Sequence, residues 1–339
     1  MTLDDIAAAT GLSPASVSLA LNDRDGLSAD TRRRVIGAAQ SLGYERSARR
    51  AVNAPPTISV VAERLPVAPT SDPFNKPILQ GLEAAARRHG YRLAMEFASP
   101  EDHPESGNWA RVPAIGVVVL GGGDLSPEWV AAAVESDLPV VMVDHFIPGL
   151  ALPAIVPDNL AGAFAATRHL IEMGHWRIGF IRGPSKYWTL GERLAGYMLA
   201  LQQAGLLGGE ELVPPRLSHG DEKGYGEMHH LLSLPTPPTA VFAVSDKTAV
   251  GAYRAAAERG LAVPADVSIV GFDDIEIARA LNPPLTTVHV PGETMGQVAF
   301  TRLRGLIAGA ERDLPVPMKW TVPTTMIHRG SVGPPYASV

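Results

Sequence analysis

MTLDDIAAATGLSPASVSLALN, residues 1–22, predicts two short helices joined by a tight turn. Leu3, Ile6 and Ala7 recur at three-to-four residue spacing, so they lie on one helical face. Gly11 ends the first helix, because glycine readily adopts the left-handed conformation that helix C-termini often need. Paired helices of this kind occur in DNA-binding heads and also in many ordinary helical bundles, so the rest of the chain has to decide between the two.

The second helix begins with a strong signal. Ser13 is a good N-cap, and Pro14 occupies the first helical position, where its missing N–H costs nothing. Val17, Ala20 and Leu21 form the inner face. The outward or lateral positions hold small and hydroxyl-bearing residues with one leucine, namely Ala15, Ser16, Ser18 and Leu19. A helix face of this kind can approach another surface closely, and the major groove of DNA admits a helix.

A third helix is predicted over residues 29–42, with Ser28 as its cap and Gly43 as its end. We therefore expect a three-helix unit over residues 1–44. Residues 45–56, ERSARRAVNAPP, form a linker that starts basic and ends in Ala-Pro-Pro. Three helices in about 44 residues bury only a small core, so tethering to a larger body would benefit this unit.

Composition sets the remaining limits. The chain has 339 residues, which suits two or three domains, and no cysteine, which excludes disulfides, thiol catalysis and cysteine-bound zinc. We expect a cytoplasmic protein without a secretory leader or a membrane span. The net charge of −6 is unevenly distributed: residues 1–56 carry seven Arg against six acidic residues, leaving 22 basic and 29 acidic residues in the rest. Phosphate binding depends on local charge, so an acidic body does not exclude a DNA-binding head.

From Ile58 onward, short apolar runs such as ISVVAE, IGVVVL and WRIGFIRG alternate with longer amphipathic stretches. Near-continuous apolar strands alternating with helices are typical of parallel sheets covered on both faces. Two series of this kind predict an α/β fold with two doubly wound, parallel-sheet lobes behind the helical head. We assign residues 57–155 and 286–319 to the first lobe, 156–285 and 320–332 to the second, and 333–339 to a tail.

Polar residues follow several of these strands. Asp144, Ser245, Asp246 and Asp273 each come directly after an apolar run. Ligands of doubly wound folds bind outside the carboxyl ends of the strands, so we expect these side chains at a cleft between the lobes. Each of them alone could equally be a helix cap. Their coincidence at several strand ends favours a binding site.

Enzyme and metal chemistry finds no support in the sequence, which lacks GxxxxGK[ST], GxSxG and HExxH motifs. The ten histidines are scattered, and we predict neither a cofactor nor a metal. Gly121-Gly122-Gly123 is best interpreted as a flexible turn. Three hypotheses remain: a DNA-binding regulator, a sugar-binding protein of a transport system, and a cofactor-using enzyme of the doubly wound type.

The sequence resembles the lactose-repressor (LacI/GalR) family of bacterial transcription regulators over nearly its whole length. TLDDIAAATGLSPASVSLALN resembles the family's helix-turn-helix, and PTAVFAVSDKTAVGAYRAAAERGLAVPADVSIVGFDDIEIARALNPPLTTV resembles its effector-binding core. The resemblance implies a non-enzymatic repressor of a sugar-utilisation operon. It also implies a homodimer that reads a palindromic double-stranded DNA operator and responds to a small effector, expected to be a sugar.

By the same resemblance, Pro14, Ala15 and Leu19 occupy the outward recognition-helix positions that set base preference. Pro14 and Ala15 offer no side-chain hydrogen bond, so any readout there is by apolar contact, for example with a thymine methyl. The other DNA-binding candidates lie near bases, near phosphates or in the linker, and they are Thr2, Leu3, Ser13, Ser16, Ser18, Asn22, Ser28, Thr31, Tyr44, Arg46 and Arg49.

The linker departs from the family pattern. The family usually shows Tyr-x-Pro-Asn-x-x-Ala-Arg-x-Leu, a hinge helix whose leucine wedges into the minor groove. Here Tyr44 is followed by ERSARRAV, so Pro-Asn is missing and Ala51 or Val52 stands near the place of the leucine. A smaller wedge unstacks bases less well, so we expect weaker DNA kinking.

In the body, Arg193 and Asp273 match the family's usual effector contacts, a fork of donors and an acceptor for sugar hydroxyls. Ser245 and Asp246 match another strand end that contacts the effector. Phe74 and Trp188 are candidate stacking residues, although loop packing is an equally good account of Trp188. With Asp144, these residues complete the predicted effector site.

Overall fold

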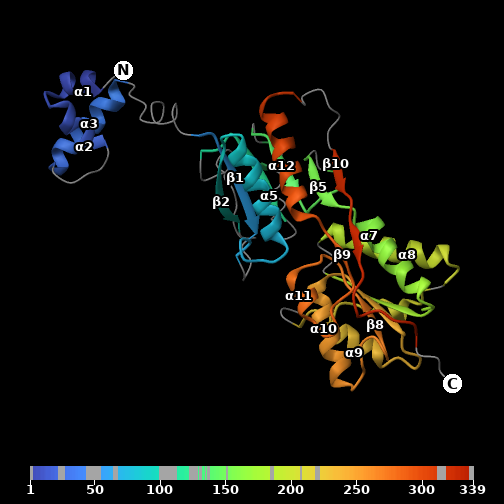
Figure 1. The fold of residues 1–339 in the computed structure, drawn as a ribbon. Coiled ribbons are helices and arrows are strands. Elements are labelled where there is room, and N and C mark those ends of the chain that lie inside the picture. Colours follow the sequence, from blue (N-terminus) through green and yellow to red (C-terminus); the bar gives the residue numbers. More distant parts are fainter. Residues whose placement is uncertain are drawn as a thin grey trace. The chain divides into compact units, whose positions relative to one another are not determined.

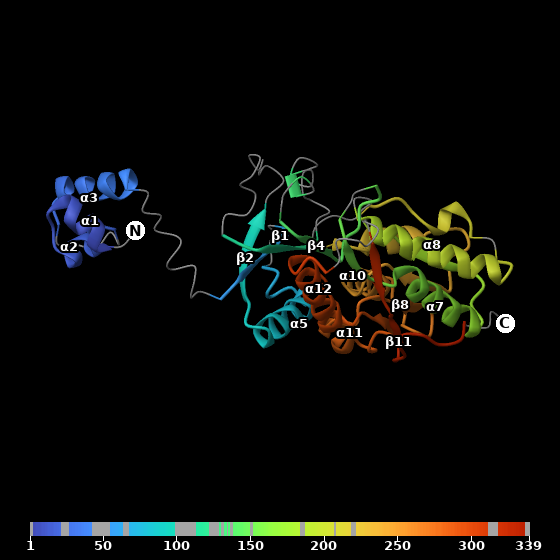
Figure 2. The same cartoon turned by 90° about the horizontal axis from the view of Figure 1, so that it is seen from above.

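The computed structural model describes residues 3–21, 27–42, 55–63, 68–98, 113–121, 129, 132–133, 135, 138–149, 152–183, 187–206, 208–217, 222–310 and 318–335. The chain divides into two compact units, Met1–Pro55 and Pro56–Val339. Figures 1 and 2 show the elements of each unit from two directions. The predicted linker is largely outside the described residues, as is most of the helix that the sequence suggests near residues 127–136.

The head contains α1 (Leu3–Thr10), α2 (Pro14–Leu21) and α3 (Ala29–Ser41), as the sequence predicts. Gly11 has φ +66°, and the N–H of Leu12 donates to the carbonyl of Ala7 over 3.2 Å, which closes α1. Ser13 Oγ accepts the Ser16 N–H at 3.1 Å, and Ser28 Oγ accepts the Thr31 N–H at 3.2 Å. Both predicted caps are therefore confirmed.

The core of the head is small. Its fully buried side chains are Ile6, Val17 and Val35, one from each helix, and alanines fill the space around them. Arg34 donates from Nη2 to the carbonyl of Thr10 at 3.1 Å, which places a cation at the C-terminus of α1. The helices thus hold together through one apolar layer and a few terminal hydrogen bonds.

The first lobe of the second unit is built on a six-stranded parallel sheet in the order β10-β5-β4-β3-β1-β2. These strands are β1 (Thr57–Glu63), β2 (Arg92–Ala98), β3 (Gly116–Leu120), β4 (Val140–Val143), β5 (Ala154–Pro157) and β10 (Lys319–Val322). Helices α5 (Asn75–Arg88) and α12 (Gly292–Ile307) pack against the sheet and each other. They approach so closely that a Cβ on Gly81 would lie 2.0 Å from the carbonyl oxygen of Glu293.

The second lobe has a three-stranded parallel sheet of β6 (Ile178–Ile181), β7 (Ala240–Ala243) and β8 (Ser268–Val270). Ala240 and Phe242 face the side covered by α7 (Asn159–Glu172) and α8 (Trp188–Gln203). Val241 and Ala243 face α9 (Tyr225–Leu232) and α10 (Asp246–Glu258). Because both faces of β7 are buried, this strand is apolar throughout. The helices on both faces of the sheet confirm the doubly wound α/β prediction.

Short elements complete the second unit. They are a 3₁₀ turn over Glu210–Leu212, α11 (Glu276–Ala280), and β9 (Thr287–His289), which pairs antiparallel with β11 (Thr325–Ile327). The chain passes from the first lobe to the second after β5, returns after β9 and passes again after β10. Because Lys319–Val322 pairs with β5, that last crossing lies after Val322 and not at the expected residue 319.

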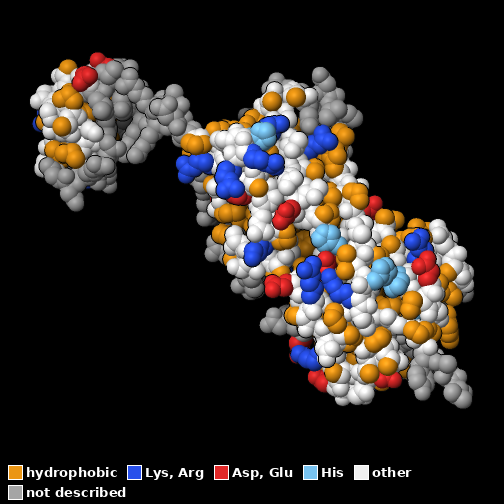
Figure 3. All heavy atoms as spheres, in the orientation of Figure 1, with side chains coloured by type: hydrophobic (Ala, Val, Ile, Leu, Met, Phe, Trp, Pro, Cys, Tyr) orange, Lys and Arg blue, Asp and Glu red, His pale blue; other side chains and the backbone are white. Residues whose placement is uncertain are grey.

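Two further observations concern the surface. On the face of the second unit drawn in Figure 3, basic and acidic side chains are interspersed. Among the helices that the structure describes, none is long and apolar enough to cross a bilayer.

Candidate functional site

A cavity of about 240 Å³ lies between the two lobes, at the carboxyl ends of their strands. Its walls include Ala62 after β1, Gly121 after β3, Gly183 after β6 and Val244 after β7. Five residues of the predicted effector site also line it: Phe74, Asp144, Arg193, Ser245 and Asp273. The parallel topology thus brings together side chains that are up to 199 positions apart in the sequence.

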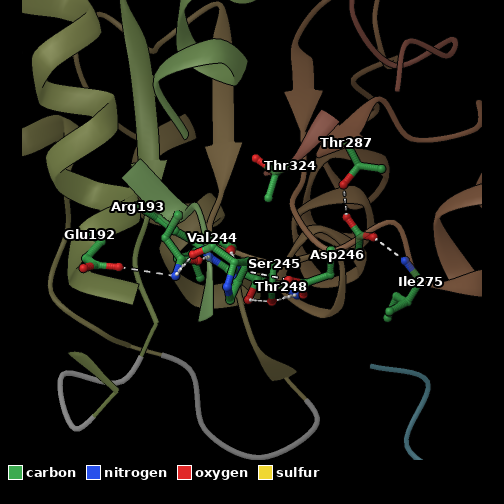
Figure 4. A network of polar contacts seen from close by, with 12 residues as sticks. Glu192, Arg193, Val244, Ser245, Asp246, Thr248, Ile275, Thr287 and Thr324 are labelled. Carbon is green, nitrogen blue, oxygen red and sulfur yellow. Dashed lines mark hydrogen bonds and ion pairs between the residues drawn. The ribbon is translucent and has the colours of Figure 1, made fainter. Parts of the chain in front are cut away.

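Arg193 is the most firmly held of these residues, with only 3% of its surface exposed. Its Nε donates to Asn159 Oδ1 at 2.8 Å, and its Nη1 donates to the carbonyl of Val244 at 2.6 Å and to Asp273 Oδ1 at 3.0 Å. The guanidinium also stacks over the ring of Phe272, 3.8 Å from the centroid. A donor fork fixed on so many sides is preorganised for a ligand (Figure 4).

Asp273 follows β8 in a strained conformation, with φ +116°. Its N–H donates to the carbonyl of Val288 at 2.8 Å, which fixes the backbone. Burial raises the pKa of the Asp273 carboxyl to about 6, although the charge and hydrogen bond of Arg193 oppose the shift. Asp144, which follows β4, also has a positive φ of +62°. Strained non-glycine residues of this kind are concentrated at functional sites.

Ser245 lines the cavity and also caps α10, because its Oγ accepts the N–H of Thr248 at 3.2 Å. Asp246 does not line the cavity. Its carboxylate is fully buried and accepts hydrogen bonds from Thr287 Oγ1 at 2.6 Å and from the N–H of Ile275 at 2.9 Å. Figure 4 shows it turned toward these two residues, so its position indicates a structural role and not ligand contact.

Trp188 also lies outside the 240 Å³ cavity. It is the first residue of α8, remains 55% exposed, and lines a neighbouring cavity of about 430 Å³. The sequence suggests that the helix begins near Arg193, but it begins at Trp188, because Gly191 weakens the helical pattern without preventing the helix. Trp188 and Arg193 therefore stand on one rigid element.

An ion pair that the sequence did not predict crosses the cavity. Lys247 Nζ lies 2.5 Å from Asp72 Oδ2, while Asp72 Oδ1 accepts the N–H groups of Phe74 and Asn75 at 3.0 and 3.1 Å. The Ser-Asp-Pro-Phe pattern could have identified Asp72 as a turn former. Its pairing with a lysine 175 residues later depends on the tertiary structure. Asn75, Tyr187, Thr189, Lys223 and Thr248 are further lining residues that the sequence did not single out.

In the head, Pro14 and Ala15 are exposed, whereas Ser16, Ser18 and Leu19 are half-buried. Ser13 and Ser28 are exposed caps. The hydroxyl of Ser13 also contacts that of Ser16, and the hydroxyl of Ser28 contacts that of Thr31. Thr2, Asn22, Tyr44, Arg46 and Arg49 lie outside the described residues, as does the side chain of Leu3. The described part of α2 thus presents a surface of small side chains.

Within the described part of the chain, no group of three or more His, Asp and Glu side chains is arranged to hold a metal ion. What the second unit offers instead is an interlobe cavity whose walls are mainly apolar but carry hydrogen-bond donors and acceptors and one phenylalanine ring. Cavities that combine mainly apolar walls with a few hydrogen-bonding groups are typical of small-molecule sites.

Residues 2–47 match the model of bacterial regulatory proteins of the lacI family, and residues 167–332 match a periplasmic binding protein-like domain. The chain is 36% identical over 321 residues to the HTH-type transcriptional repressor CytR of Escherichia coli K12, covering 91% of this chain and 90% of that protein. The chain belongs to the LacI family. It is a ligand-responsive, DNA-binding transcription regulator with a helix-turn-helix head and a periplasmic-binding-protein-like body.

Other members of the LacI family match at similar coverage. The ribose operon repressor of Haemophilus influenzae is 32% identical, over 89% of this chain and 90% of that protein. Among solved structures, the complex of the transcriptional regulator CelR with cellobiose is 30% identical, with a TM-score of 0.71 and coverage of 98% and 99%. The lac repressor dimer bound to operator has the same fold, at 24% identity, a TM-score of 0.71 and the same coverage.

Proposed function

We propose that this LacI-family regulator is a homodimeric repressor of a sugar-utilisation operon, which acts in the cytoplasm. The observation that carries the proposal is the Arg193–Asp273 pair, held in an interlobe cavity of a chain that also has a DNA-binding head. The names of two relatives support a sugar as the effector, since one is a ribose operon repressor and another was solved with cellobiose.

The chemistry of the cavity suits a sugar. The guanidinium of Arg193 can donate to ring or hydroxyl oxygens, and the carboxylate of Asp273 can accept from hydroxyl groups. Asp144 and Ser245 add further acceptors and a donor on opposite walls. Phe74 offers an aromatic face against which the apolar face of a sugar ring can pack. Asp246 is left out of the proposed site because its carboxylate is occupied elsewhere.

For DNA, we propose that α2 enters the major groove with Pro14, Ala15 and Leu19 toward the base edges. Leu3, Ser16 and Ser18 would lie near the bases, and the remaining contacts would be made with phosphates or in the minor groove. This second group comprises Thr2, Ser13, Asn22, Ser28, Thr31, Tyr44, Arg46 and Arg49. Because phosphate contacts release counterions, operator binding is expected to fall steeply with salt.

The proposed response links the cavity to the head through the lobe crossings. A ligand that contacts Arg193 and Asp144 together bridges the two lobes, and so favours their closed arrangement over the open one. The first lobe, which ends after β5, resumes after β9 and ends again after Val322, would move against the second lobe, and the linker over residues 45–56 would transmit the change to the head.

Two measurements test the proposal. Selection of bound duplexes from a random library, followed by fluorescence anisotropy at about 0.15 M salt, should yield a palindrome bound at least 10³-fold more tightly than random duplex. A thermal-shift screen of sugars should then find a ligand that raises Tm and changes operator affinity. Equal affinity for palindrome and random duplex would contradict the repressor, and a ligand whose shift is unchanged in Asp273→Ala would contradict the site.

A further inference from the structure

Basic side chains gather at one end of the first lobe, the end at which the chain enters from the linker. Figure 3 shows them, with a histidine among them, over the part of the lobe formed by α5 and α12. The strand β1 begins at Thr57, directly after Pro56, and the N–H of Arg92 at the start of β2 donates to the carbonyl of Pro56 over 2.9 Å. The linker and the start of β2 therefore meet at this end.

Both helices of the lobe also end there. At the start of α12, a Cβ on Gly292 would lie 3.0 Å from Pro77 in the first turn of α5. In the last turn of α12, Arg304 contacts His89 just after α5, with 2.7 Å between Nη1 and Nδ1. The two helices are thus parallel. The buried ring of Phe300 stacks on His89, with 5.4 Å between the centroids, and fixes the two ends to each other.

This surface, which we call the basic end, carries four guanidinium groups, those of Arg87, Arg88, Arg92 and Arg304. Among the residues that the structure describes, only Arg87 has a carboxylate partner, Glu83, at 3.8 Å between Nε and Oε1. Arg88 donates to the carbonyl of Ala84, and Arg304 donates to His89. Arg88 and Arg92 are exposed, so both guanidinium groups can reach a partner outside the molecule.

Helix electrostatics explain only part of this arrangement. A cation at a helix C-terminus stabilises the macrodipole, which accounts for Arg88 and Arg304 taken singly. It does not account for Arg92 at the start of a strand, nor for the meeting of cations from two helices and a strand. In the second lobe, the exposed Arg168 is paired with Glu172 at 3.2 Å. An uncompensated cluster in a body with 22 basic and 29 acidic residues is suited to an anionic partner.

DNA is the polyanion that this protein brings to the basic end. The head is a DNA-binding domain, and the linker between head and body has 12 residues, which span at most about 40 Å. The linker itself contains Arg46, Arg49 and Arg50, so basic residues continue along the chain from the head to the body. Guanidinium groups match phosphate oxygens in a bidentate geometry.

We propose that the basic end of the first lobe is a second DNA-contacting surface, on which Arg88, Arg92 and Arg304 bind phosphates of the duplex that the head holds. His89 positions the guanidinium of Arg304. Phosphate contacts carry no sequence information, so the basic end adds affinity and leaves base preference to the head. It also gives the body a direct contact with DNA besides the linker. The inference goes beyond the proposed function and does not depend on the effector.

Fluorescence anisotropy on the full-length protein tests the inference, with the selected palindrome and a random duplex at about 0.05 to 0.2 M salt. Arg88→Gln/Arg304→Gln removes four charges from a dimer, and each phosphate contact contributes about 0.9 to the slope of log affinity against log salt. We expect the slope to become shallower by about 2 to 4, and the affinity at about 0.15 M salt to fall tenfold or more. Arg88→Lys/Arg304→Lys keeps the charges and should restore most of the slope.

A matched control removes the same charge elsewhere. Arg168→Gln/Arg216→Gln acts at exposed positions of the second lobe and should leave the slope unchanged. Arg92→Gln, tested alone, should make the slope shallower by up to about 2, which supplies an independent variant if the double variant is poorly folded. Ethylation interference should identify phosphates whose modification weakens binding of the wild type but not of Arg88→Gln/Arg304→Gln.

An unchanged slope in both Arg88→Gln/Arg304→Gln and Arg92→Gln would overturn the inference. So would an equal loss in the control, because the effect would then reflect net charge alone. Identical ethylation patterns for the wild type and the double variant would likewise show that the basic end does not touch the duplex.

Discussion

Lys247 at the start of α10 and Asp72 before α5 form an ion pair that joins the two lobes across the interlobe cavity, with 2.5 Å between Nζ and Oδ2. Asp72 is held in place by the backbone N–H groups of Phe74 and Asn75, so only the lysine side chain is adjustable. We expect the pair to favour the closed arrangement of the lobes, so that a ligand entering the cavity would have to compete with it or bridge it.

Removal of this contact should open the cleft. Lys247→Met deletes the cation but keeps the length of the side chain, so we expect a larger radius of gyration of the ligand-free protein by small-angle X-ray scattering. Because the lysine side chain is 40% exposed, the loss in unfolding free energy should stay below about 1 kcal/mol. Lys76→Met, at an exposed position of α5, is the control and should change neither quantity. An unchanged radius for Lys247→Met would show that the pair does not hold the lobes.

The pH dependence of the unfolding free energy should reveal the raised pKa of Asp273. Its folded-state pKa of about 6 lies above the ordinary 3.8, so between these values the folded state binds more protons than the unfolded state. The contribution of Asp273 to the unfolding free energy is therefore fully present below about pH 4 and is lost as the pH rises through 6. Urea unfolding of the wild type and Asp273→Asn should therefore show the wild type losing stability relative to the variant, by on the order of 2 kcal/mol, between pH 4 and pH 7. A difference that is constant with pH would contradict the raised pKa.

Asp246 should behave as a structural residue. Asp246→Ala leaves the hydroxyl of Thr287 and the N–H of Ile275 without their acceptor in a fully buried place, which should cost about 2–3 kcal/mol of unfolding free energy. The affinity of the folded protein for its effector should change less than twofold. Asp266→Ala, which removes an exposed acceptor of the Ala262 N–H, is the matched control and should cost about 1 kcal/mol or less. A tenfold loss of effector affinity in Asp246→Ala would restore it to the site.

Ser28 combines a cap with a predicted DNA contact, and two variants separate the roles. Ser28→Ala should destabilise the head by about 1 kcal/mol, because the N–H of Thr31 loses its acceptor. Ser28→Asp keeps an acceptor at the helix N-terminus, so hydrogen exchange in α3 should stay slow. If Ser28 lies beside a phosphate, the added charge should still weaken operator binding severalfold. Normal operator affinity in Ser28→Asp would leave Ser28 with the capping role alone.

A substitution at Ala15 should change the operator sequence that the head prefers. Ala15→Asn introduces a side chain that can pair with the N6 and N7 edge of adenine, whereas alanine offers only an apolar contact. Selection of duplexes by the variant should therefore replace one base pair in each half-site, with a discrimination of about 1–3 kcal/mol at that position. Ala8→Asn, an exposed substitution on α1, should leave the selected site unchanged. An unchanged site in Ala15→Asn would place this residue away from the bases.

Much of the molecule is readable from local patterns. Ser13-Pro14 and Ser28 mark helix starts, and Gly11 marks a helix end, because capping needs only neighbouring residues. The apolar run around Phe242 identifies a strand covered on both faces, and the polar residues after such strands indicate where a cleft lies. Asp144, Ser245 and Asp273 could be predicted in this way, whereas Phe74 and Arg193 were predicted only through the resemblance to the family.

The sequence by itself therefore determined the elements, the parallel architecture and the edge at which ligand groups gather, since each follows from residues within one or two turns or along one strand. Only the tertiary structure decided which aspartates face the cavity. Asp246 and Asp273 both follow buried strands. The carboxylate of Asp246 accepts hydrogen bonds from Thr287 and Ile275, whereas that of Asp273 pairs with Arg193 in the cavity. The Lys247–Asp72 contact was likewise decided by the tertiary structure, because partners 175 residues apart in the chain meet only after the lobes have packed.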